Sequence, residues 1–404
     1  MRILFVNHTS TAGGAEQGLL RLVDGLKATH TVAVACPRQG AVRELVDAAG
    51  VEALTIPAFE ASLRLHPVHT PVGLARLTAG GVALARLAKR FGADLVHANT
   101  PRAGLICAVT RRLGGPPVVV HLRDDLPLNR VGRAVRFTLI RSASAVVAVS
   151  EYTAARFNEG LSRPVATHVH NSIDLERFDP NRVTAAPVRD QLGISPDAPL
   201  LGQISQITPW KGQDTAIRAV ADLRRRGLDA HLLIAGAVTF GARGVRYDNH
   251  AYLRSLHERV ASLGVRDAVH FLGQRSDVPE LLTALDVSLL PSVNEPFGRV
   301  IVESMAIGTP PLVSDVGSGP ELVEDGVSGR LLPPDRPELW ATAAAELLRD
   351  RAALARMGAE AQARAARFSD EAQVRGVLAV YDSVLPGAAH TGLPGSTEAV
   401  SWRA

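Results

Sequence analysis

The strongest constraint on the fold is an alternation of strand and helix patterns that occurs twice along the 404-residue chain. Short runs of Val, Ile, Leu and Ala alternate with segments whose apolar residues recur every three or four positions, as at 19–26. This alternation is typical of a parallel sheet with helices on both faces. In the first half, strands are expected at 2–7, 31–36, 51–56, 95–98, 118–121, 145–149 and 166–170.

Four prolines interrupt the pattern between residues 179 and 199, after which it restarts. Further strands are expected at 200–205, 231–235, 269–272, 287–290 and 311–313. We therefore predict an α/β protein of two facing Rossmann-like domains with a cleft between them. The predicted segments are a domain at 1–180, a linker at 181–199, a domain at 200–370, a C-terminal helix at 371–385 that can cross back, and a disordered tail at 386–404.

Composition narrows the class of protein. No apolar run reaches the ~18 residues of a membrane span, and the N-terminus lacks the apolar core of a signal peptide. Cys36 and Cys107 have no metal or disulfide spacing, so a cytoplasmic protein is expected. Residues 1–180 hold 21 Lys/Arg against 14 Asp/Glu. This basic half fits an acidic acceptor, an anionic membrane face or an ordinary Arg-rich surface; no nucleic-acid partner is expected.

Two loops that follow predicted strands have the character of anion sites. The paired glycines Gly13 and Gly14 open the first helix and leave backbone N–H groups free, although the dinucleotide spacing G-x-G-x-x-G is absent. Lys211 lies between Trp210 and Gly212, on the loop after the first strand of the second domain. A lysine at that position can neutralise a leaving phosphate.

The segment 295–303 contains two carboxylates eight positions apart. Glu295 precedes Pro296 and so ends a loop, whereas Glu303 falls on the helix that follows the turn at Gly298. Carboxylates beside a helix N-terminus suit a ligand with both hydroxyl and phosphate groups, such as a nucleotide sugar.

Residues 202–337 resemble the donor domain of retaining glycosyltransferase family 4, enzymes of GT-B fold that include glycogen synthase and phosphatidylinositol mannosyltransferase. The resemblance is carried by Glu295 and Glu303 with the motifs at 210–214, 271–273, 286–292, 305–310 and 325–329. Looser matches lie in the first half at 13–16 and 171–180.

The resemblance implies a role for particular positions. Glu295, Lys211 and His121 would be catalytic, with Glu295 on the sugar, Lys211 on the diphosphate and His121 contacting the sugar from the first domain. The implied donor-binding residues are Gly14, Gln206, Phe271, Leu272, Phe297, Gly298, Arg299 and Glu303. Gly13, Glu16, Arg123 and Asp124 are assigned to the acceptor side.

One position departs from the family pattern. An arginine commonly lies five residues before the lysine, and here that position is Gln206, with Arg299 and Arg123 as candidate replacements. No Asp-x-Asp triplet occurs, so we expect transfer without a metal or other cofactor.

The acceptor class stays open among a natural product, a lipid carrier and a saccharide. The basic amphipathic helix expected at 129–141 fits either a packed surface helix or peripheral contact with the inner membrane face. The alternatives to a transferase are a nucleotide-sugar epimerase and a non-catalytic nucleotide-sugar-binding protein, with a Rossmann oxidoreductase weaker than both.

Overall fold

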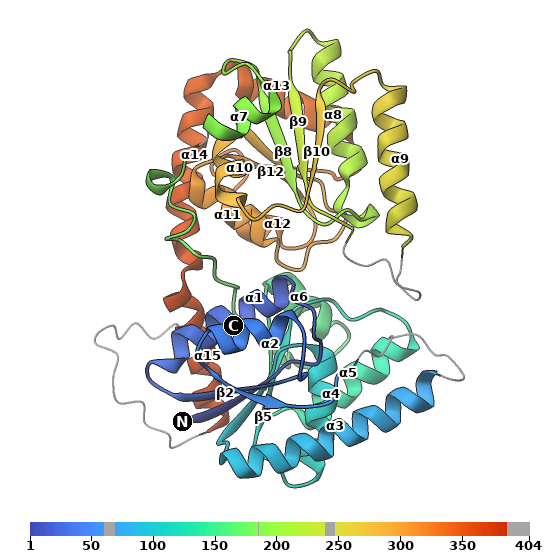
Figure 1. Ribbon diagram of the computed structural model, residues 1–404, viewed down its shortest axis with the longest axis vertical. Coiled ribbons are helices and arrows are strands. Elements are labelled where there is room, and N and C mark those ends of the chain that lie inside the picture. The colour runs from blue at the N-terminus through green and yellow to red at the C-terminus, as the bar shows by residue number, and fades with distance from the viewer. Residues whose placement is uncertain (60–68, 185, 239–246, 386–404) are drawn as a thin grey trace.

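The computed structural model describes residues 1–59, 69–184, 186–238 and 247–385, and the predicted tail at 386–404 lies outside them. Figure 1 shows two α/β domains stacked along the long axis of the molecule, each built on a parallel sheet. The predicted pair of Rossmann-like domains is thereby confirmed. Among the helices of the described residues, none combines the length and apolar character needed to cross a bilayer.

Within the described residues, seven parallel strands form the first sheet in the order β3-β2-β1-β4-β5-β6-β7. The strands are β1 Arg2–Val6, β2 Thr31–Cys36, β3 Glu52–Thr55, β4 Leu95–Ala98, β5 Val118–Leu122, β6 Ala145–Ala148 and β7 Ala166–His168. The helices are α1 Gly14–Lys27, α2 Ala41–Ala48, α3 His69–Phe91, α4 Pro101–Arg112, α5 Arg130–Ser142 and α6 Glu151–Asn158. The strand order reverses between β1 and β4, and such a reversal opens a crevice at the carboxyl ends of the strands.

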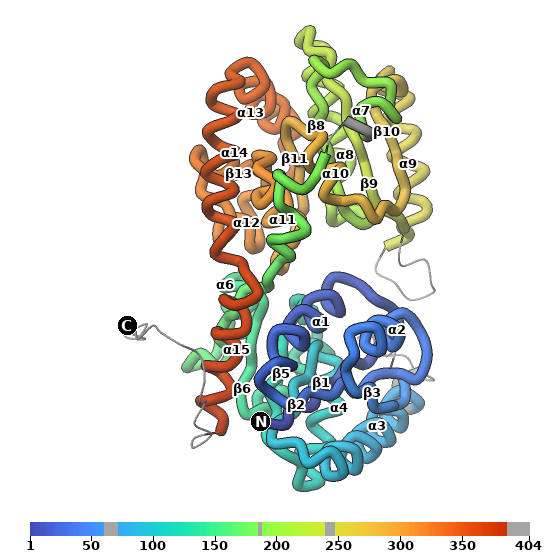
Figure 2. Tube along the Cα trace, turned by 60° about the vertical axis from the view of Figure 1, so that its left-hand side comes forward, coloured from blue at the N-terminus to red at the C-terminus, as the bar shows by residue number. Residues whose placement is uncertain are grey.

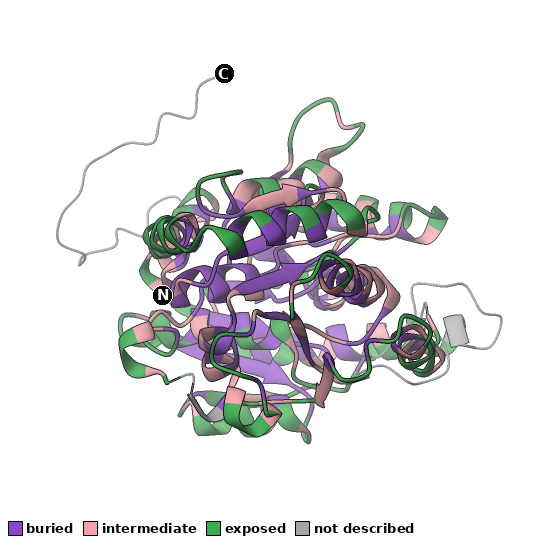
Figure 3. Ribbon diagram, turned by 90° about the horizontal axis from the view of Figure 1, so that it is seen from above, coloured by how far each residue is buried: buried purple, intermediate pink, exposed green. Residues whose placement is uncertain are grey.

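Both faces of this sheet are buried, because successive side chains of a strand point to opposite faces. In β1, Leu4 and Val6 pack into the cluster formed with α3, α4 and α5. Ile3 and Phe5 pack instead with α1, α2 and a helix from the C-terminal end of the chain. Figure 3 shows the buried strands between helices with exposed outer faces.

In the described part of the second domain, six parallel strands follow the order β10-β9-β8-β11-β12-β13. They are β8 Leu200–Ile204, β9 His231–Ala235, β10 Val269–Gly273, β11 Val287–Leu290, β12 Pro311–Ser314 and β13 Arg330–Leu332. The helices are α7 Ala186–Leu192, α8 Gln213–Arg225, α9 Asn249–Ser262, α10 Val278–Ala284, α11 Arg299–Ile307, α12 Gly319–Leu322, α13 Pro337–Arg349 and α14 Arg351–Ala365. Short 3₁₀ turns lie at Pro180–Arg182, Pro209–Lys211 and Ala366–Phe368.

The segment 181–199 is more than the linker that its prolines suggested. It contains α7, and Val188 and Ile194 are buried in the same apolar cluster as Leu281 of α10. The prediction overlooked this short helix because its apolar residues are too few to show a helical period. This part of the segment therefore belongs structurally to the second domain.

The chain returns to the first domain through α15, Asp370–Val384. Figure 2 shows α14 and α15 following one side of the molecule from the second domain down to the first. Val377 and Tyr381 of α15 are fully buried against the first sheet. At the start of α15, Asp370 forms an ion pair with Arg21 of α1. The guanidinium of Arg21 also lies 3.0 Å from the carboxylate of Asp174. The final helix thus completes the first domain.

A buried chain of polar rings ties α15 to the sheet. The Tyr381 hydroxyl lies 2.7 Å from Nδ1 of His97 on β4, and Nε2 of His97 lies 3.2 Å from Nδ1 of His121 on β5. Burial lowers the pKa of His97 to about 3 and that of His121 well below its ordinary value of 6.5. Both imidazoles are therefore neutral in the folded protein at neutral pH.

This burial predicts acid-sensitive stability. The unfolded chain takes up protons on these histidines below pH 6.5 while the folded chain does not, so stability is complete above pH 6.5 and falls as the pH drops toward 3. Each such histidine lowers the free energy of unfolding by about 1.4 kcal/mol for each pH unit over that range. In unfolding measured from pH 7.5 to 5, His97→Asn should have a shallower pH dependence, whereas exposed His250→Asn should match the wild type. Equal slopes for all three proteins would contradict the prediction.

Candidate active site

The loop after β11 brings the first two predicted residues together. Lys211 Nζ lies 2.5 Å from Oε2 of Glu295, and both side chains are largely buried. Ser292 donates to the same carboxylate oxygen at 3.2 Å, and the Trp210 ring lies 4.1 Å from the ammonium. A cation over an aromatic face is further stabilised by the ring quadrupole. The lysine and the acid thus form one pair before any ligand arrives.

Glu303 lies one turn into α11 and is also paired. Nη2 of Arg299 donates to its Oε1 at 3.1 Å, while Nη1 of the same arginine donates to Gln17 of α1 at 2.5 Å. Burial raises the pKa of Glu303 despite the positive charges of Arg299, Arg177 and Arg21. Arg299 therefore connects a carboxylate of the second domain with the first helix of the other domain.

The backbone between the two acids has a shape that only glycine accommodates well. Gly298 has φ of +72°, and a Cβ there would lie 2.9 Å from Cγ of Glu295. The next residues begin α11, so their N–H groups form the free end of a helix. Phe297 is buried in the core and anchors this turn from below.

Two residues that sequence reasoning missed hold this loop from behind. Gly317 has φ of +65°, and a Cβ on it would lie 2.5 Å from the carbonyl oxygen of Glu295. Ser318 donates from its backbone N to that same carbonyl at 2.9 Å and from its hydroxyl to the Phe297 carbonyl at 2.8 Å. The pair Gly317-Ser318 looked like an ordinary turn in the sequence, since its partners are more than twenty residues away.

On the first domain, the Gly13-Gly14 turn begins α1 as predicted, and a Cβ on Gly14 would meet no atom within 4 Å. Glu16, however, turns back on its own helix, where its Oε2 accepts from the N–H of Gly13 at 3.0 Å. Burial raises the pKa of this carboxyl group. Glu16 thus caps the helix N-terminus.

The two residues at the end of β5 lie differently. His121 is fully buried inside the sheet, faces His97 and does not join Glu295 and Lys211. Asp124, two positions beyond the strand, is exposed, and the charges of Glu295 and Lys211 act on it from the other domain. Nε2 of His121 is buried without a hydrogen-bond partner among the described residues, and its predicted contact with the sugar stays a prediction.

The loop that carries the lysine is supported by a glutamine that was not among the predicted site residues. Gln206 accepts a hydrogen bond through its backbone carbonyl from Gln213, 2.7 Å away. Gln203, at the end of β8, is buried and donates from Nε2 to the Lys211 carbonyl at 2.6 Å. Its Oε1 is buried without a hydrogen-bond partner among the described residues. Gln203 is therefore the amide that directly supports the lysine loop.

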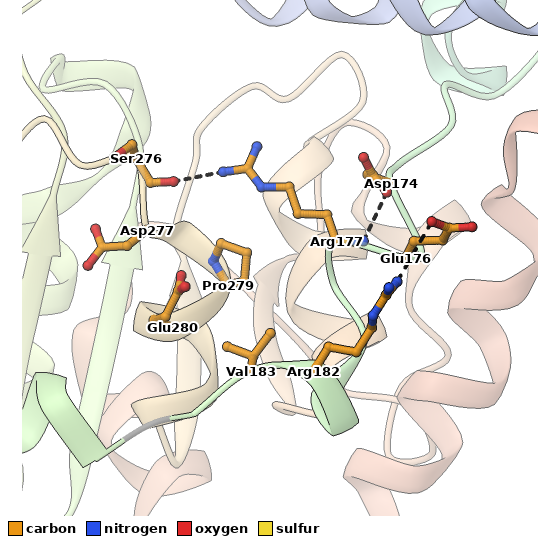
Figure 4. Close-up of a pocket in the computed structure, with 9 residues that line it drawn as sticks. All are labelled: Asp174, Glu176, Arg177, Arg182, Val183, Ser276, Asp277, Pro279 and Glu280. Atoms are coloured by element: carbon orange, nitrogen blue, oxygen red, sulfur yellow. Dashed lines mark hydrogen bonds and ion pairs between the residues drawn. The ribbon is translucent and has the colours of Figure 1, made fainter.

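The residues expected to frame the base lie at the end of β10. The Phe271 ring is partly buried, with its centroid 4.3 Å from that of His257, and Leu272 packs partly into the second-domain core. Arg177 of the interdomain connection donates to the carbonyl of Ser276, just beyond β10, at 2.7 Å. Arg177 and Ser276, together with Asp174 and Asp277, line a cavity of about 610 Å³, whereas Phe271 and Leu272 are not among its lining residues. Figure 4 shows the side chains that line it.

Direct hydrogen bonds join the two domains beside Glu295. The Ser150 hydroxyl, at the start of α6, donates to the Pro296 carbonyl at 2.5 Å. Asn294 accepts from the Tyr152 hydroxyl at 2.9 Å and donates to Asp125 at 3.2 Å. The loop that carries Glu295 is thus held partly by the first domain.

Glu321 of α12 makes a second bridge. Its carboxylate accepts from the backbone N–H groups of Glu151 and Tyr152, at 2.7 and 2.6 Å, in the first turn of α6. It also lies 3.1 Å from Nε2 of His170. A carboxylate at a helix N-terminus is stabilised by the free N–H groups and the helix dipole.

Comparison with known proteins identifies the family. The family model described as Glycosyl transferases group 1 matches residues 186–364, and the model described as Glycosyltransferase Family 4 matches residues 12–177. A D-inositol 3-phosphate glycosyltransferase of Nocardia farcinica is 36% identical over 316 residues, which cover 72% of this chain and 67% of that protein. The chain therefore belongs to glycosyltransferase family 4.

Other relatives agree on the family and the fold. The enzyme of the same name from Stackebrandtia nassauensis is 35% identical over 230 residues, which cover 53% of this chain and about half, 51%, of that protein. The structure of Anabaena Alr3699/HepE in complex with UDP-glucose superposes with a TM-score of 0.81, at 27% identity, over 95% of this chain and 100% of that one. The predicted GT-B fold is thereby confirmed.

The support behind Glu295 gives a test of the loop. Gly317→Ala should destabilise the protein by roughly 1–3 kcal/mol beyond the cost of positive φ alone, because its methyl group collides with the Glu295 backbone. Gly326→Ala is the matched control, since Gly326 has φ of +75° and open space around it. Thermal unfolding of both variants measures the difference in stability. Equal midpoints would show that the Glu295 loop shifts to accommodate the methyl group without a cost in stability.

Proposed function

We propose that this protein is a retaining glycosyltransferase that moves a sugar from a nucleoside diphosphate sugar to an acceptor hydroxyl. The supporting observation is the buried pair of Lys211 and Glu295 at the entrance to α11, facing Asp124 of the first domain. It combines a cation for the diphosphate, a carboxylate for sugar hydroxyls and a free helix end. The UDP-glucose bound by the Anabaena protein favours a UDP-sugar among the UDP- and GDP-linked donors.

In the proposed reaction, the diphosphate lies between the N-termini of α11 and α1, and Glu303 accepts from the ribose hydroxyls. The bond between the anomeric carbon and the diphosphate oxygen breaks, and the acceptor oxygen bonds to that carbon on the same face. The acceptor proton passes to the departing diphosphate. Lys211 and the helix N-termini stabilise the charge that develops on the leaving group, which is where electrostatic stabilisation is most effective.

We further propose that transfer needs no metal. The described residues contain no group of three or more His, Cys, Asp or Glu side chains arranged to hold an ion. Lys211 supplies a positive charge at the position where other enzymes use a divalent cation. Undiminished turnover in the presence of a chelator would agree with this proposal.

Replacement of Glu295 by glutamine should separate binding from transfer. Glu295→Gln removes the negative charge that now occupies Lys211, so UDP should bind at least as tightly while transfer falls by roughly 100-fold or more. Lys211→Met is the complementary variant and should weaken UDP binding. Calorimetry with UDP, together with NMR of the product's anomeric configuration, measures both quantities. Full transfer by Glu295→Gln would refute the assignment, and a C2 epimer formed without acceptor would favour the epimerase.

The surface of helix α5 supports a proposal that the enzyme binds its acceptor at a membrane. Val135 and Leu139 pack inward, while Leu128, just before the helix, and Phe137 are 69% and 58% exposed. The exposed basic residues of the helix are Arg130, Arg133 and Arg141. Exposed apolar groups among arginines suit an anionic membrane surface. We therefore propose a cytoplasmic enzyme that contacts the inner membrane face through its first domain, where a lipid-linked acceptor is available.

Vesicle binding tests this surface. The protein should sediment with vesicles containing phosphatidylglycerol and not with pure phosphatidylcholine, and added salt should release it. The double variant Leu128→Ser/Phe137→Ser should lose most of the bound fraction, whereas Leu263→Ser, on the second domain, should keep it. Equal binding by both variants would exclude this surface and leave a small-molecule or saccharide acceptor.

A further inference from the structure

Arg123 is a buried cation with an unusual set of partners. Its side chain is 6% exposed at the end of β5, where Nε donates to Oδ1 of Asn99 at 3.1 Å and Nη1 donates to Oδ1 of Asn171. Nη2 is buried without a hydrogen-bond partner among the described residues. Both groups that hold this guanidinium are therefore neutral amides.

The two cations that directly contact Glu295 and Glu303 are already neutralised. Lys211 is paired with Glu295, and Arg299 is paired with Glu303. In contrast, Arg123 makes no ion pair within 4.0 Å with any acid of the described residues. The carboxylates of Glu16 and Asp124 attract this charge without forming an ion pair with it. Burying Nη2 without a hydrogen-bond partner in the described part of the chain is costly, so its retention points to an anion that arrives later.

The position of Arg123 directs its charge toward the start of α1. A Cβ on Gly18 of that helix would lie 2.9 Å from Nη1, so the guanidinium packs directly against the helix. Asn99, which accepts the hydrogen bond from Nε of Arg123, donates from its Nδ2 to the carbonyl of Ala15, in the first turn of α1, at 3.2 Å. Arg123 therefore adds a full positive charge near the end of the helix whose dipole is already positive.

Helix α15 fixes this arrangement from the other side. Gln373 is 2% exposed and donates from Nε2 to Oδ1 of Asn171 at 3.3 Å, while its Oε1 accepts from Ser172 at 2.9 Å. Oδ1 of Asn171 thus accepts hydrogen bonds from both Arg123 and Gln373. The C-terminal helix consequently helps to set the guanidinium in place.

We propose that Arg123 supplies the positive charge that family members obtain from the arginine absent here, acting on the donor diphosphate through the first turn of α1, with Gln373 as its positioning residue. The inference rests on the proposed function, since it needs a nucleoside diphosphate between α1 and α11. Burial and the charge of Arg299 lower the pKa of Arg123 to about 10, so it remains charged at neutral pH. An anion between the two arginines would relieve their repulsion and favour domain closure.

The experiment compares nucleotide binding in four variants of the full chain. UDP, GDP and ADP are first titrated into the wild type, and the tightest ligand is used throughout. Arg123→Met should raise its Kd at least tenfold and flatten the dependence of Kd on salt, while Arg123→Lys should recover most of the affinity. Gln373→Leu should raise both Kd and the KM for the sugar donor several-fold, with a smaller change in kcat.

Tyr381→Phe is the matched control, because it removes a buried hydroxyl of the same helix that takes no part in the hydrogen bonds of Arg123. It should lower the thermal midpoint about as much as Gln373→Leu and leave Kd unchanged. If Arg123→Met binds with wild-type affinity and salt dependence, or if Tyr381→Phe weakens binding as Gln373→Leu does, the inference is overturned. A wild type that binds no nucleoside diphosphate would instead refute the proposed function, and this inference with it.

Discussion

The first domain depends on a helix that the chain supplies last. One face of its sheet is covered by α1 and α2, and the apolar residues Val377 and Tyr381 of α15 complete that cover over Phe5. Removing these side chains from water contributes roughly 1.5–3 kcal/mol each. The chain must therefore cross between the domains twice, once before β8 and once after α14. Any relative motion of the domains would bend the chain at these two connections.

The site takes its shape from this arrangement. The loop of Glu295 belongs to the second domain, yet Ser150 and Tyr152 of α6 hold its neighbours through hydrogen bonds. Glu321 reaches in the opposite direction to cap α6. If the domains opened, these groups would form hydrogen bonds to water instead. Each exchange would cost a net free energy of about 1 kcal/mol. The contacts are thus individually weak enough for substrate exchange and jointly sufficient to define the closed geometry.

The sequence was informative where structure follows from local pattern. Apolar runs and helical spacing predict both sheets, and Gly298, three residues after Glu295, predicts the turn into α11. The sequence was uninformative where the arrangement depends on distant partners or on the end of an element. His121 lies within β5 and Arg123 lies just beyond its end, and nothing in the local sequence shows where the strand stops. Likewise, no local pattern shows that the amide of Gln203 donates to the carbonyl of Lys211, in the 3₁₀ turn before Gly212.

Each carboxylate proposed to hold a hydroxyl group of the donor is bound to a cation without ligand: Glu295 to Lys211, and Glu303 to Arg299. A buried acid left alone would be costly, so these pairs keep the empty site stable. Under the proposed function, the diphosphate of a nucleotide sugar would take over the cations while its hydroxyl groups take over the acids, so every charge would keep a partner. Binding is then an exchange of partners. A free sugar or a free phosphate would satisfy half of each pair and leave the other half exposed, which favours the intact donor over either fragment.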